Sequence, residues 1–267
     1  MNVGILGANG FVGRSLCLKY LNENSNVYAI YHKNSSLIPK GCSLISIDLA
    51  HNFDFDYLVI AIGGHGSTYQ EFLNQYLFLD SIIKNYKYNK IIFISSVEVY
   101  GKNKNSISVE SCFNNPSGYG VSKISQEFLI KSVPNYTIIR PTYLYGIGMN
   151  ENSLIPIWIN KAKSEKEIVV YGEGNRKQDY LHIDDLSQLC WLSTLSNENK
   201  NAIIAASGKS VSNFEVATEI CKKVPDSIVK FFGEDNTESS YFDISHTQKK
   251  YNWTPKLAIK DWLNEYI

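Results

Sequence analysis

Residues 4–16 read GILGANGFVGRSL and set three glycines, Gly7, Gly10 and Gly13, between a strand-like run and a helix-like run. Glycine permits a tight turn, and its missing side chain lets backbone N–H groups approach a pyrophosphate at a helix N-terminus. Phe11 and Val12 follow the turn, and we expect them to contact the cofactor together with the glycines. The stretch predicts a strand–turn–helix unit that binds a nucleotide, with a plain tight turn as the alternative.

Outward from this loop, six short runs rich in β-branched residues predict strands that are buried on both faces. They cover residues 2–6, 26–31, 43–48, 56–62, 90–96 and 136–142. Amphipathic runs at 13–24 and 69–86 lie between some of them and predict helices. This alternation is typical of an α/β fold, and we expect a Rossmann-type doubly wound parallel sheet.

The second half of the chain is less regular. Residues 153–166 and 213–224 predict helices, residues 168–174 predict a short strand and turn, and the chain ends in a further helix. We expect a Rossmann domain over residues 1–150, to which residues 176–205 return. Residues 151–175 and 206–267 are expected to form a small α/β C-terminal lobe that binds substrate.

Composition excludes several classes of protein. Lys and Arg number 26, as do Asp and Glu, so the formal net charge of zero does not favour binding to nucleic acid. No apolar run approaches 18 residues, which argues against a membrane span, and the N-terminus lacks the basic start of a signal peptide. Five scattered cysteines without a C-x-x-C pair predict reduced thiols and a cytoplasmic protein.

The identity of the dinucleotide depends on the end of the second strand. A carboxylate that binds the ribose is expected about 20 residues after the glycines. There the chain reads IYHKNSS, with His32 and Lys33 and no acid nearby. A cation favours the 2′-phosphate of NADP(H), while NAD(H) and a solvated loop end remain alternatives. Asp48 is expected to accept a hydrogen bond from the adenine, with Leu49 and Ala61 as further cofactor contacts.

A tyrosine and a lysine four residues apart mark a candidate catalytic helix. Tyr119 and Lys123 in GYGVSK, residues 118–123, share one helix face. The ammonium should lower the pKa of the phenol, which then exchanges a proton with a carbonyl or hydroxyl as hydride moves. Lys123 can also bind the cofactor ribose, and Ser96 follows a buried strand and can orient the substrate oxygen. An ordinary surface pair and a helix-capping serine are the alternatives.

Six motifs occur in order along nearly the whole chain: GANGFVG, IDL, ISSVEVYG, P..GYGVSK, IIRPTYLYG and GEGNRKQDYLHIDDL. Together they resemble the extended short-chain dehydrogenase/reductases, in particular the branch that acts on nucleotide sugars. The resemblance implies Ser96, Tyr119 and Lys123 as the catalytic residues and matches Asn74 to a family asparagine. It also implies that the C-terminal lobe holds the nucleotide diphosphate of the substrate.

Departures from the family pattern narrow the set of reactions that the chain is expected to catalyse. The 4,6-dehydratases carry an Asp-Glu pair after the catalytic serine or threonine, whereas this chain has Val97 and Glu98, which argues against a dehydratase. The family's Arg-Asp-aromatic motif reads Gln178-Asp179-Tyr180, with Arg176 two places before it. Glu98 and Arg176 are candidate substrate contacts, a solvated side chain being the alternative for Arg176.

The segment LHIDDL, residues 181–186, suggests a metal site through its histidine and two aspartates. In the family it is a structural return to the sheet, so we expect no metal. Arg140 ends a buried strand, where packing or an ion pair is the leading expectation and substrate contact the alternative. Gly63 and residues 64–67 are expected beside the cofactor or in a plain turn.

The sequence and the resemblance together favour an NADPH-dependent reductase of a 4-keto-6-deoxyhexose linked to a nucleoside diphosphate. A nucleotide-sugar 4-epimerase with NAD is the first alternative, because it uses the same three catalytic residues. A non-catalytic NADP-binding regulator is the second. The expected partner is the nucleotide-sugar substrate, without nucleic acid or membrane, and a homodimer is one of the assemblies that the sequence leaves open.

Overall fold

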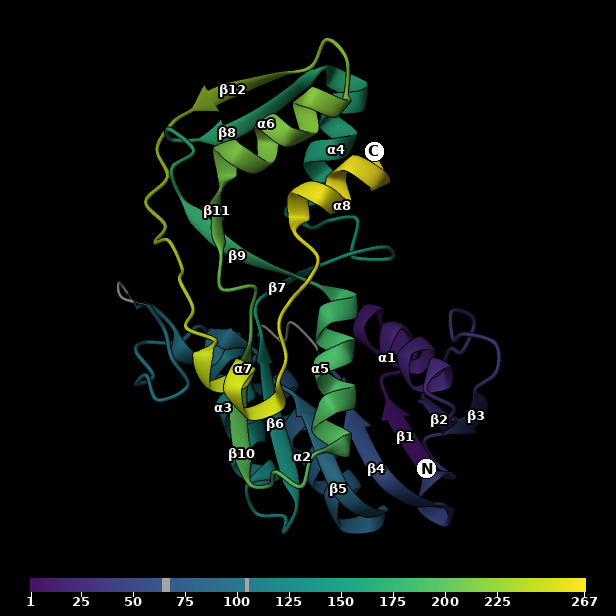
Figure 1. The fold of residues 1–267 in the computed structure, drawn as a ribbon. Helices are drawn as coiled ribbons and strands as arrows, with labels where there is room; N and C mark the ends of the chain where they lie inside the picture. Colours follow the sequence, from purple (N-terminus) through teal and green to yellow (C-terminus); the bar gives the residue numbers. More distant parts are fainter. Residues whose placement is uncertain (64–67, 104–105) are drawn as a thin grey trace.

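The computed structural model describes residues 1–63, 68–103 and 106–267 of the chain. The larger domain is a seven-stranded sheet covered by helices on both faces, and a smaller lobe lies over one edge of that sheet (Figure 1). The predicted α/β class is therefore confirmed, as is the doubly wound arrangement.

The central sheet is parallel throughout, with the strand order β10-β6-β5-β4-β1-β2-β3. Its strands are β1 (Asn2–Leu6), β2 (Asn26–Tyr31), β3 (Ser43–Ser46), β4 (Asp54–Ile60), β5 (Lys87–Ile94), β6 (Tyr136–Pro141) and β10 (Asn201–Ala205). Six of these were predicted, with ends that differ by up to three residues. The strand β10 was not predicted, although it falls in the segment that was expected to return to this domain.

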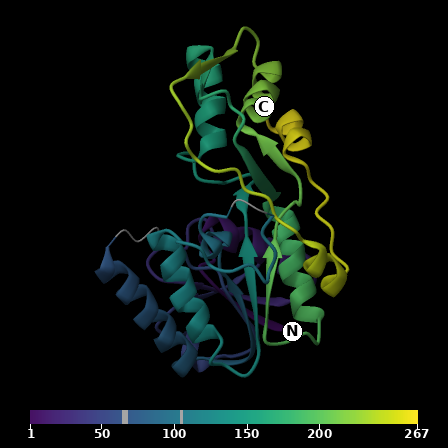
Figure 2. The same cartoon turned by 90° about the vertical axis from the view of Figure 1, so that its left-hand side faces the viewer.

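Helices cover both faces of the sheet (Figures 1 and 2). On one face lie α1 (Phe11–Asn22) and α5 (Ile183–Leu195), and on the other lie α2 (Tyr69–Asn85) and α3 (Gly118–Ile130). The helix α2 begins at a capping box, in which the Thr68 hydroxyl accepts from the Glu71 N–H and the Glu71 carboxylate accepts from the Thr68 N–H. Two short 3₁₀ turns, η1 (Ala50–Asn52) and η2 (Val97–Tyr100), follow β3 and β5.

The smaller lobe is built around its own apolar core, in which Trp158, Ile168, Tyr145 and Trp262 are buried. It contains β7 (Tyr143–Tyr145), α4 (Leu154–Glu165), β8 (Glu167–Tyr171), β9 (Lys177–His182), β11 (Ser210–Ser212), α6 (Asn213–Lys223), β12 (Ile228–Phe232) and α8 (Ile259–Tyr266). The strands form two small sheets, β11-β9-β7 and β12-β8. The helices α4, α6 and α8 and the strand β8 were predicted, whereas β7, β9, β11 and β12 were not.

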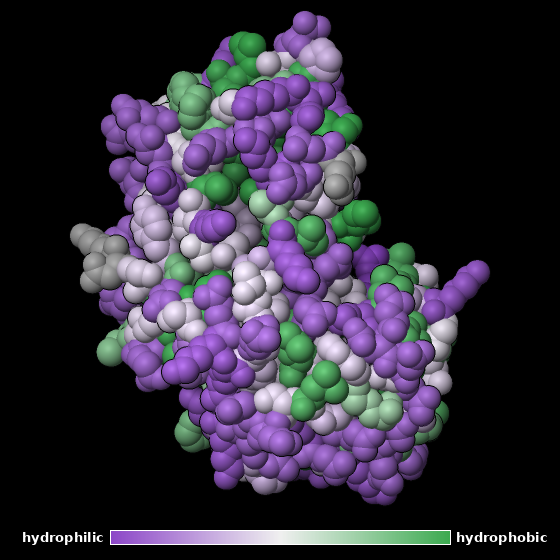
Figure 3. Space-filling model, viewed as in Figure 1, coloured by the Kyte–Doolittle hydropathy of each residue, from purple (hydrophilic) through white to green (hydrophobic). Residues whose placement is uncertain are grey.

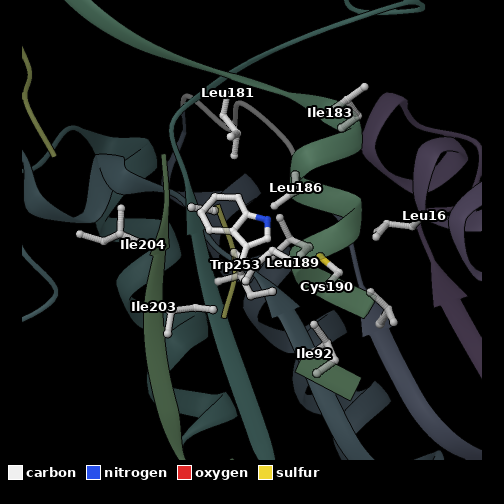
Figure 4. Close-up of a cluster of buried hydrophobic side chains, with 14 of the residues drawn as sticks. Leu16, Ile92, Leu181, Ile183, Leu186, Leu189, Cys190, Ile203, Ile204 and Trp253 are labelled. Atoms are coloured by element: carbon white, nitrogen blue, oxygen red, sulfur yellow. The ribbon is translucent and has the colours of Figure 1, made fainter. Parts of the chain in front are cut away.

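One part of the C-terminal segment packs against the larger domain. The helix α7 (Ser245–Tyr251) lies beside α5 and β10, and Trp253 is buried among Leu186, Leu189 and Ile203 (Figure 4). The Trp253 indole also donates a hydrogen bond to the carbonyl of Asp185, at 3.1 Å. The expected division assigned all of residues 206–267 to the small lobe, so these contacts differ from it. A buried tryptophan binds the tail to the larger core because its large apolar area is removed from water.

In the described residues, no helix is both long and apolar enough to span a membrane. Hydrophilic side chains cover most of the face seen in Figure 3, and the hydrophobic residues on it are scattered in small groups.

Candidate active site

The glycine turn between β1 and α1 is packed against neighbouring backbone too closely to admit side chains at Gly7 and Gly13. A Cβ atom on Gly13 would lie 2.1 Å from the Gly7 carbonyl oxygen, and one on Gly7 would lie 2.6 Å from the Ala61 carbonyl oxygen. Gly7 also has a φ of +89°, which L-residues rarely adopt. No side chain among the described residues caps α1 at Gly10, and its first turn contains no acid. The backbone N–H groups there are thus suited to a pyrophosphate, which fits a dinucleotide cofactor.

A cavity of about 650 Å³ continues from this turn along the ends of β1, β2 and β3. Its size lies in the range of small-molecule sites. Six of the cofactor residues expected from the sequence line it, namely Gly7, Gly10, His32, Lys33, Asp48 and Ala61. Phe11, Gly13 and Leu49 do not. Phe11 packs between the two cores, Gly13 lets the turn close, and Leu49 is largely exposed.

The loop that carries His32 and Lys33 is attached to the glycine turn. The Asn9 side-chain oxygen accepts a hydrogen bond from the Leu37 N–H at 2.9 Å, and the Asn34 side chain accepts from the Ser36 N–H at 2.8 Å. The first of these bonds joins the loop to the glycine turn, and His32 and Lys33 both line the cavity. Sequence reasoning missed Asn9, because its partner is 28 residues away.

A second cavity, of about 530 Å³, lies at the ends of β4, β5 and β6. It shares Ala61, Ile62 and Gly63 with the first cavity, so that one groove runs along the carboxyl edge of the sheet. Ser96, Tyr119, Lys123 and Val12 all line this second part. The three residues that the sequence proposed as catalytic therefore lie around one space, although 27 residues of chain separate Ser96 from Lys123. Residues 64–67, which were also expected near the cofactor, lie outside the described residues.

Lys123 is buried where two strands end. Its side chain is only 2% exposed, and its ammonium donates hydrogen bonds to the carbonyls of Ile62 at 3.0 Å and Ile94 at 3.1 Å. The ammonium also lies 5.0 Å from the centre of the Phe93 ring. Burial lowers the pKa of Lys123 to about 8, while the nearby Glu127 carboxylate opposes this shift. A fixed positive charge is thus held at the floor of the groove.

The pKa of Tyr119 is shifted in the direction opposite to our expectation. Burial raises it, the Glu98 carboxylate raises it further, and a hydrogen bond with Ser96 lowers it. The expectation that Lys123 lowers this pKa was wrong, because burial is the largest cause of the shift and Lys123 is not among the groups that set it. Tyr119 therefore keeps its proton at neutral pH, which suits a proton donor better than a base.

A buried ion pair lies behind Lys123 on α3. The Glu127 carboxylate accepts from Arg140 Nε at 2.9 Å and Nη2 at 2.7 Å, and from the Ser95 hydroxyl at 2.6 Å. Arg140 donates a further bond to the Tyr100 hydroxyl at 2.7 Å. The expectation of an ion pair for Arg140 is thus confirmed. The network ties α3, the end of β5 and β6 together beneath the catalytic residues.

A third cavity, of about 270 Å³, opens between η2 and the small lobe and shares Val97, Glu98 and Tyr143 with the second. Arg176 lines it, and the Nε atom of this residue is buried without a hydrogen-bond partner among the described residues. A buried, unpaired guanidinium nitrogen at a cavity wall suits an anionic ligand. Both candidate substrate residues, Glu98 and Arg176, thus face this space.

The segment around His182 serves the structure. His182 Nδ1 accepts from the Asp184 N–H at 3.2 Å, and the Asp185 carboxylate accepts from the N–H groups of Lys256 and Leu257. The described residues contain no cluster of three or more acidic, histidine or cysteine side chains that could hold a metal ion.

Asp179, from the motif that departs from the family pattern, also has a structural role. Its buried carboxylate accepts from the N–H groups of Ser207 and Gly208, at 2.7 and 2.8 Å. Asn74 is exposed on α2, where it accepts from Gln70 at 2.9 Å, and it lines none of the three cavities. The match of Asn74 to a family asparagine remains a prediction.

The model of the NAD dependent epimerase/dehydratase family matches residues 3–205, and the chain therefore belongs to that family. It is similar to the dTDP-D-glucose 4,6-dehydratase of Dictyostelium discoideum, with 31% identity over 51% of this chain and 36% of that protein. It is also similar to the dTDP-4-dehydro-6-deoxyglucose reductase of Escherichia coli, with 27% identity over 67% of this chain and 60% of that protein. The chain thus spans about one third to three fifths of the length of these two relatives.

Solved structures share the fold along the full chain. A UDP-N-acetylglucosamine 4-epimerase from Methanobrevibacter ruminantium M1, in complex with UDP-N-acetylmuramic acid, superimposes with a TM-score of 0.85 and 24% identity. That match covers 99% of this chain and 96% of the epimerase. MoeE5 in complex with UDP-glucuronic acid and NAD gives a TM-score of 0.84 and 19% identity, over 99% of this chain and 97% of MoeE5.

Proposed function

We propose that the chain is an NADPH-dependent reductase of a 4-keto-6-deoxyhexose carried on a nucleoside diphosphate. The observation that carries this proposal is the single groove, with His32 and Lys33 at one end and Ser96, Tyr119 and Lys123 at the other. The similarity to the E. coli reductase supports it.

The protein residues around the groove suit reduction of a ketone. When bound, the nicotinamide would supply the hydride. Ser96 donates a hydrogen bond to the ketone oxygen, and Tyr119 transfers its proton to that oxygen as negative charge develops there. The raised pKa of Tyr119 keeps this proton in place until the reaction begins. Lys123 stabilises the resulting phenolate, since its ammonium is held in the same cavity.

The nucleotide part of the substrate is assigned to the third cavity. Arg176 lies on its wall and would pair with the diphosphate, which would satisfy the buried Nε atom. The cavity joins the catalytic one at Val97, Glu98 and Tyr143, so a sugar on the diphosphate would reach Tyr119. Val97 stands where dehydratases of the family carry an acid, so loss of water from the sugar is not part of the proposal.

A nucleotide-sugar 4-epimerase is the second candidate. The chain is similar along its whole length to an uncharacterised UDP-glucose epimerase of Bacillus subtilis, with 22% identity. An epimerase would use Ser96, Tyr119 and Lys123 in both directions and would keep its cofactor oxidised between turnovers. A non-catalytic regulator is disfavoured because all three residues line one cavity.

Assembly and location remain predictions. A homodimer is supported by exposed apolar side chains on the adjacent helices α2 and α3, such as Leu77, Val121 and Phe128. Light scattering of the purified chain tests it. A cytoplasmic location rests on the scattered cysteines, and fractionation of the source cells tests that.

A substitution at Lys33 tests the proposed preference for NADPH over NADH. Replacing Lys33 by glutamate turns attraction for the 2′-phosphate into repulsion, at about 1 kcal/mol per charge pair near 4 Å in water. We expect the NADPH dissociation constant to rise roughly 10- to 100-fold, while that of NADH changes little. Lys40→Glu, on an exposed lysine outside the cavity, is the matched control. Unmutated protein that binds NADH at least as tightly as NADPH would contradict the assignment to NADPH.

A further inference from the structure

Two cysteine side chains meet between α1 and the segment that precedes β3. Cys17 lies on α1 and is buried, whereas Cys42 stands directly before β3 and is partly exposed. Cys42 packs against the apolar core that contains Cys17, and a hydrogen bond joins the two thiols. Both cysteines are free thiols in this structure. Their sulfur atoms are therefore neighbours, which is the first requirement for a bond between them.

The segment of residues 32–42, here called the cofactor loop, connects β2 to β3 beside α1 (Figure 1). Its first two residues line the cofactor cavity. Its middle is joined to the glycine turn, because the Leu37 N–H donates to the Asn9 side-chain oxygen at 2.9 Å. Near its end, a Cβ atom on Gly41 would lie 3.4 Å from the Leu21 side chain of α1. Non-covalent contacts thus hold the cofactor loop against α1, and Cys42 is its last residue.

The hydrogen bond between the thiols makes the two cysteines chemically unlike. The Cys17 thiol donates it, which lowers the pKa of Cys42, although burial opposes that shift. The same hydrogen bond, followed by burial, raises the pKa of Cys17. The thiolate is the reactive form of cysteine, and a partly exposed cysteine with a lowered pKa reaches it most readily. Cys42 is thus suited to react first, with the protonated Cys17 beside it.

We propose that Cys17 and Cys42 are an oxidisable pair, which hydrogen peroxide converts to a reversible disulfide that fastens the cofactor loop to α1. This inference does not depend on the sugar substrate or on the direction of hydride transfer. A reactive cysteine next to a second cysteine that can complete the disulfide is typical of redox-sensitive sites in proteins whose thiols are otherwise reduced.

The oxidation balances in two steps with one molecule of peroxide. The Cys42 thiolate attacks one peroxide oxygen, so that an S–O bond forms and the O–O bond breaks. The second oxygen leaves as hydroxide and takes up the proton that Cys42 had lost, which gives water and a sulfenic acid. The Cys17 sulfur then attacks the Cys42 sulfur, the S–S bond forms, and the S–O bond breaks. Hydroxide leaves with the Cys17 proton as a second water, so both sulfur atoms are oxidised and the peroxide is reduced.

The test is peroxide treatment of the reduced full chain, followed by alkylation of the remaining thiols and digestion with trypsin. Trypsin places Cys17 in the peptide 15–19 and Cys42 in the peptide 41–84. We expect mass spectrometry to find these two peptides linked, with the loss of two hydrogen atoms, and separate again after dithiothreitol. The melting temperature of the oxidised chain should rise by roughly 5–10 °C, because the bond restricts the unfolded chain.

Single variants separate the roles of the two cysteines. Cys42→Ser should abolish both the link and the rise in melting temperature. Cys17→Ser should leave Cys42 as a sulfenic acid, which dimedone labels. Cys112→Ser, on an exposed cysteine, is the matched control and should form the link as the wild type does.

Two results would overturn the inference. One is wild-type protein in which peroxide oxidises Cys112 but leaves the peptide 15–19 unlinked. The other is a link between Cys17 and a cysteine other than Cys42, which would persist in the Cys42→Ser variant. Either result can be obtained whether or not the chain reduces a keto-sugar, so the proposed function is tested separately.

Discussion

The substitution Glu127→Gln should destabilise the fold strongly, although glutamine has nearly the same shape as glutamate. The side chains of Arg140 and Glu127 are 4% and 2% exposed, and they make two hydrogen bonds of 2.7 and 2.9 Å. Glu127→Gln leaves the Arg140 cation buried beside a neutral amide. Loss of one partner of a buried ion pair costs about 3–5 kcal/mol. For a chain of this size, the melting temperature should fall by roughly 6–20 °C.

The assay is urea unfolding of the full chain, followed by circular dichroism at neutral pH. The matched control is Glu165→Gln, which removes the same charge from an exposed pair with Lys161 at 3.5 Å. That control should cost no more than about 0.5 kcal/mol. The double variant Glu127→Leu/Arg140→Met removes both charges and should lose less stability than Glu127→Gln alone. If Glu127→Gln costs under about 1 kcal/mol, the reasoning is refuted.

Three further predictions concern the groove. Tyr119→Phe should lower kcat for the keto-sugar by about 10²–10⁴-fold while NADPH binding is retained, and nearly full activity would remove Tyr119 from the mechanism. NADPH binding by the wild type should weaken as pH rises through about 8, because Lys123 loses its positive charge there; a dissociation constant that stays flat from pH 7 to 9 would contradict this. Gly13→Ala should weaken NADPH binding, since its Cβ would lie 2.1 Å from the Gly7 carbonyl oxygen, and calorimetric titration equal to that of the wild type would show that the glycine turn tolerates a side chain.

Local patterns in the sequence were sufficient for six of the seven strands of the central sheet. Runs such as YLVI and KIIFI are apolar at every position, which is typical of strands buried on both faces of a parallel sheet. The strands of the small lobe were harder to predict from the sequence, because β7 and β11 have three residues each and β12 is largely exposed. Trp253 lies in a segment that was assigned to the small lobe, yet it is buried in the core of the larger domain, because the sequence pattern does not say which of two cores a tail enters.

The candidate site was predicted where its residues lie in short motifs. Ser96, Tyr119 and Lys123 line one cavity, as their motifs suggested. The contact between Glu98 and Tyr143 joins residues 45 apart, and no periodicity indicates it.

The sign of the pKa shift on Tyr119 was missed for a related reason. Helical spacing indicates which charges are near a phenol, but the burial that dominates this shift depends on elements distant in the sequence.

The central claim is that this chain reduces a nucleotide-linked ketone with NADPH, and net consumption of NADPH tests it most directly. The absorbance of NADPH is followed while the purified chain is given first an NDP-hexose and then an NDP-4-keto-6-deoxyhexose. We expect no loss of absorbance with the first substrate, and loss of one NADPH for each keto-sugar reduced with the second. Conversion of the plain NDP-hexose to its C4 epimer, with the absorbance unchanged, would contradict the account and identify an epimerase.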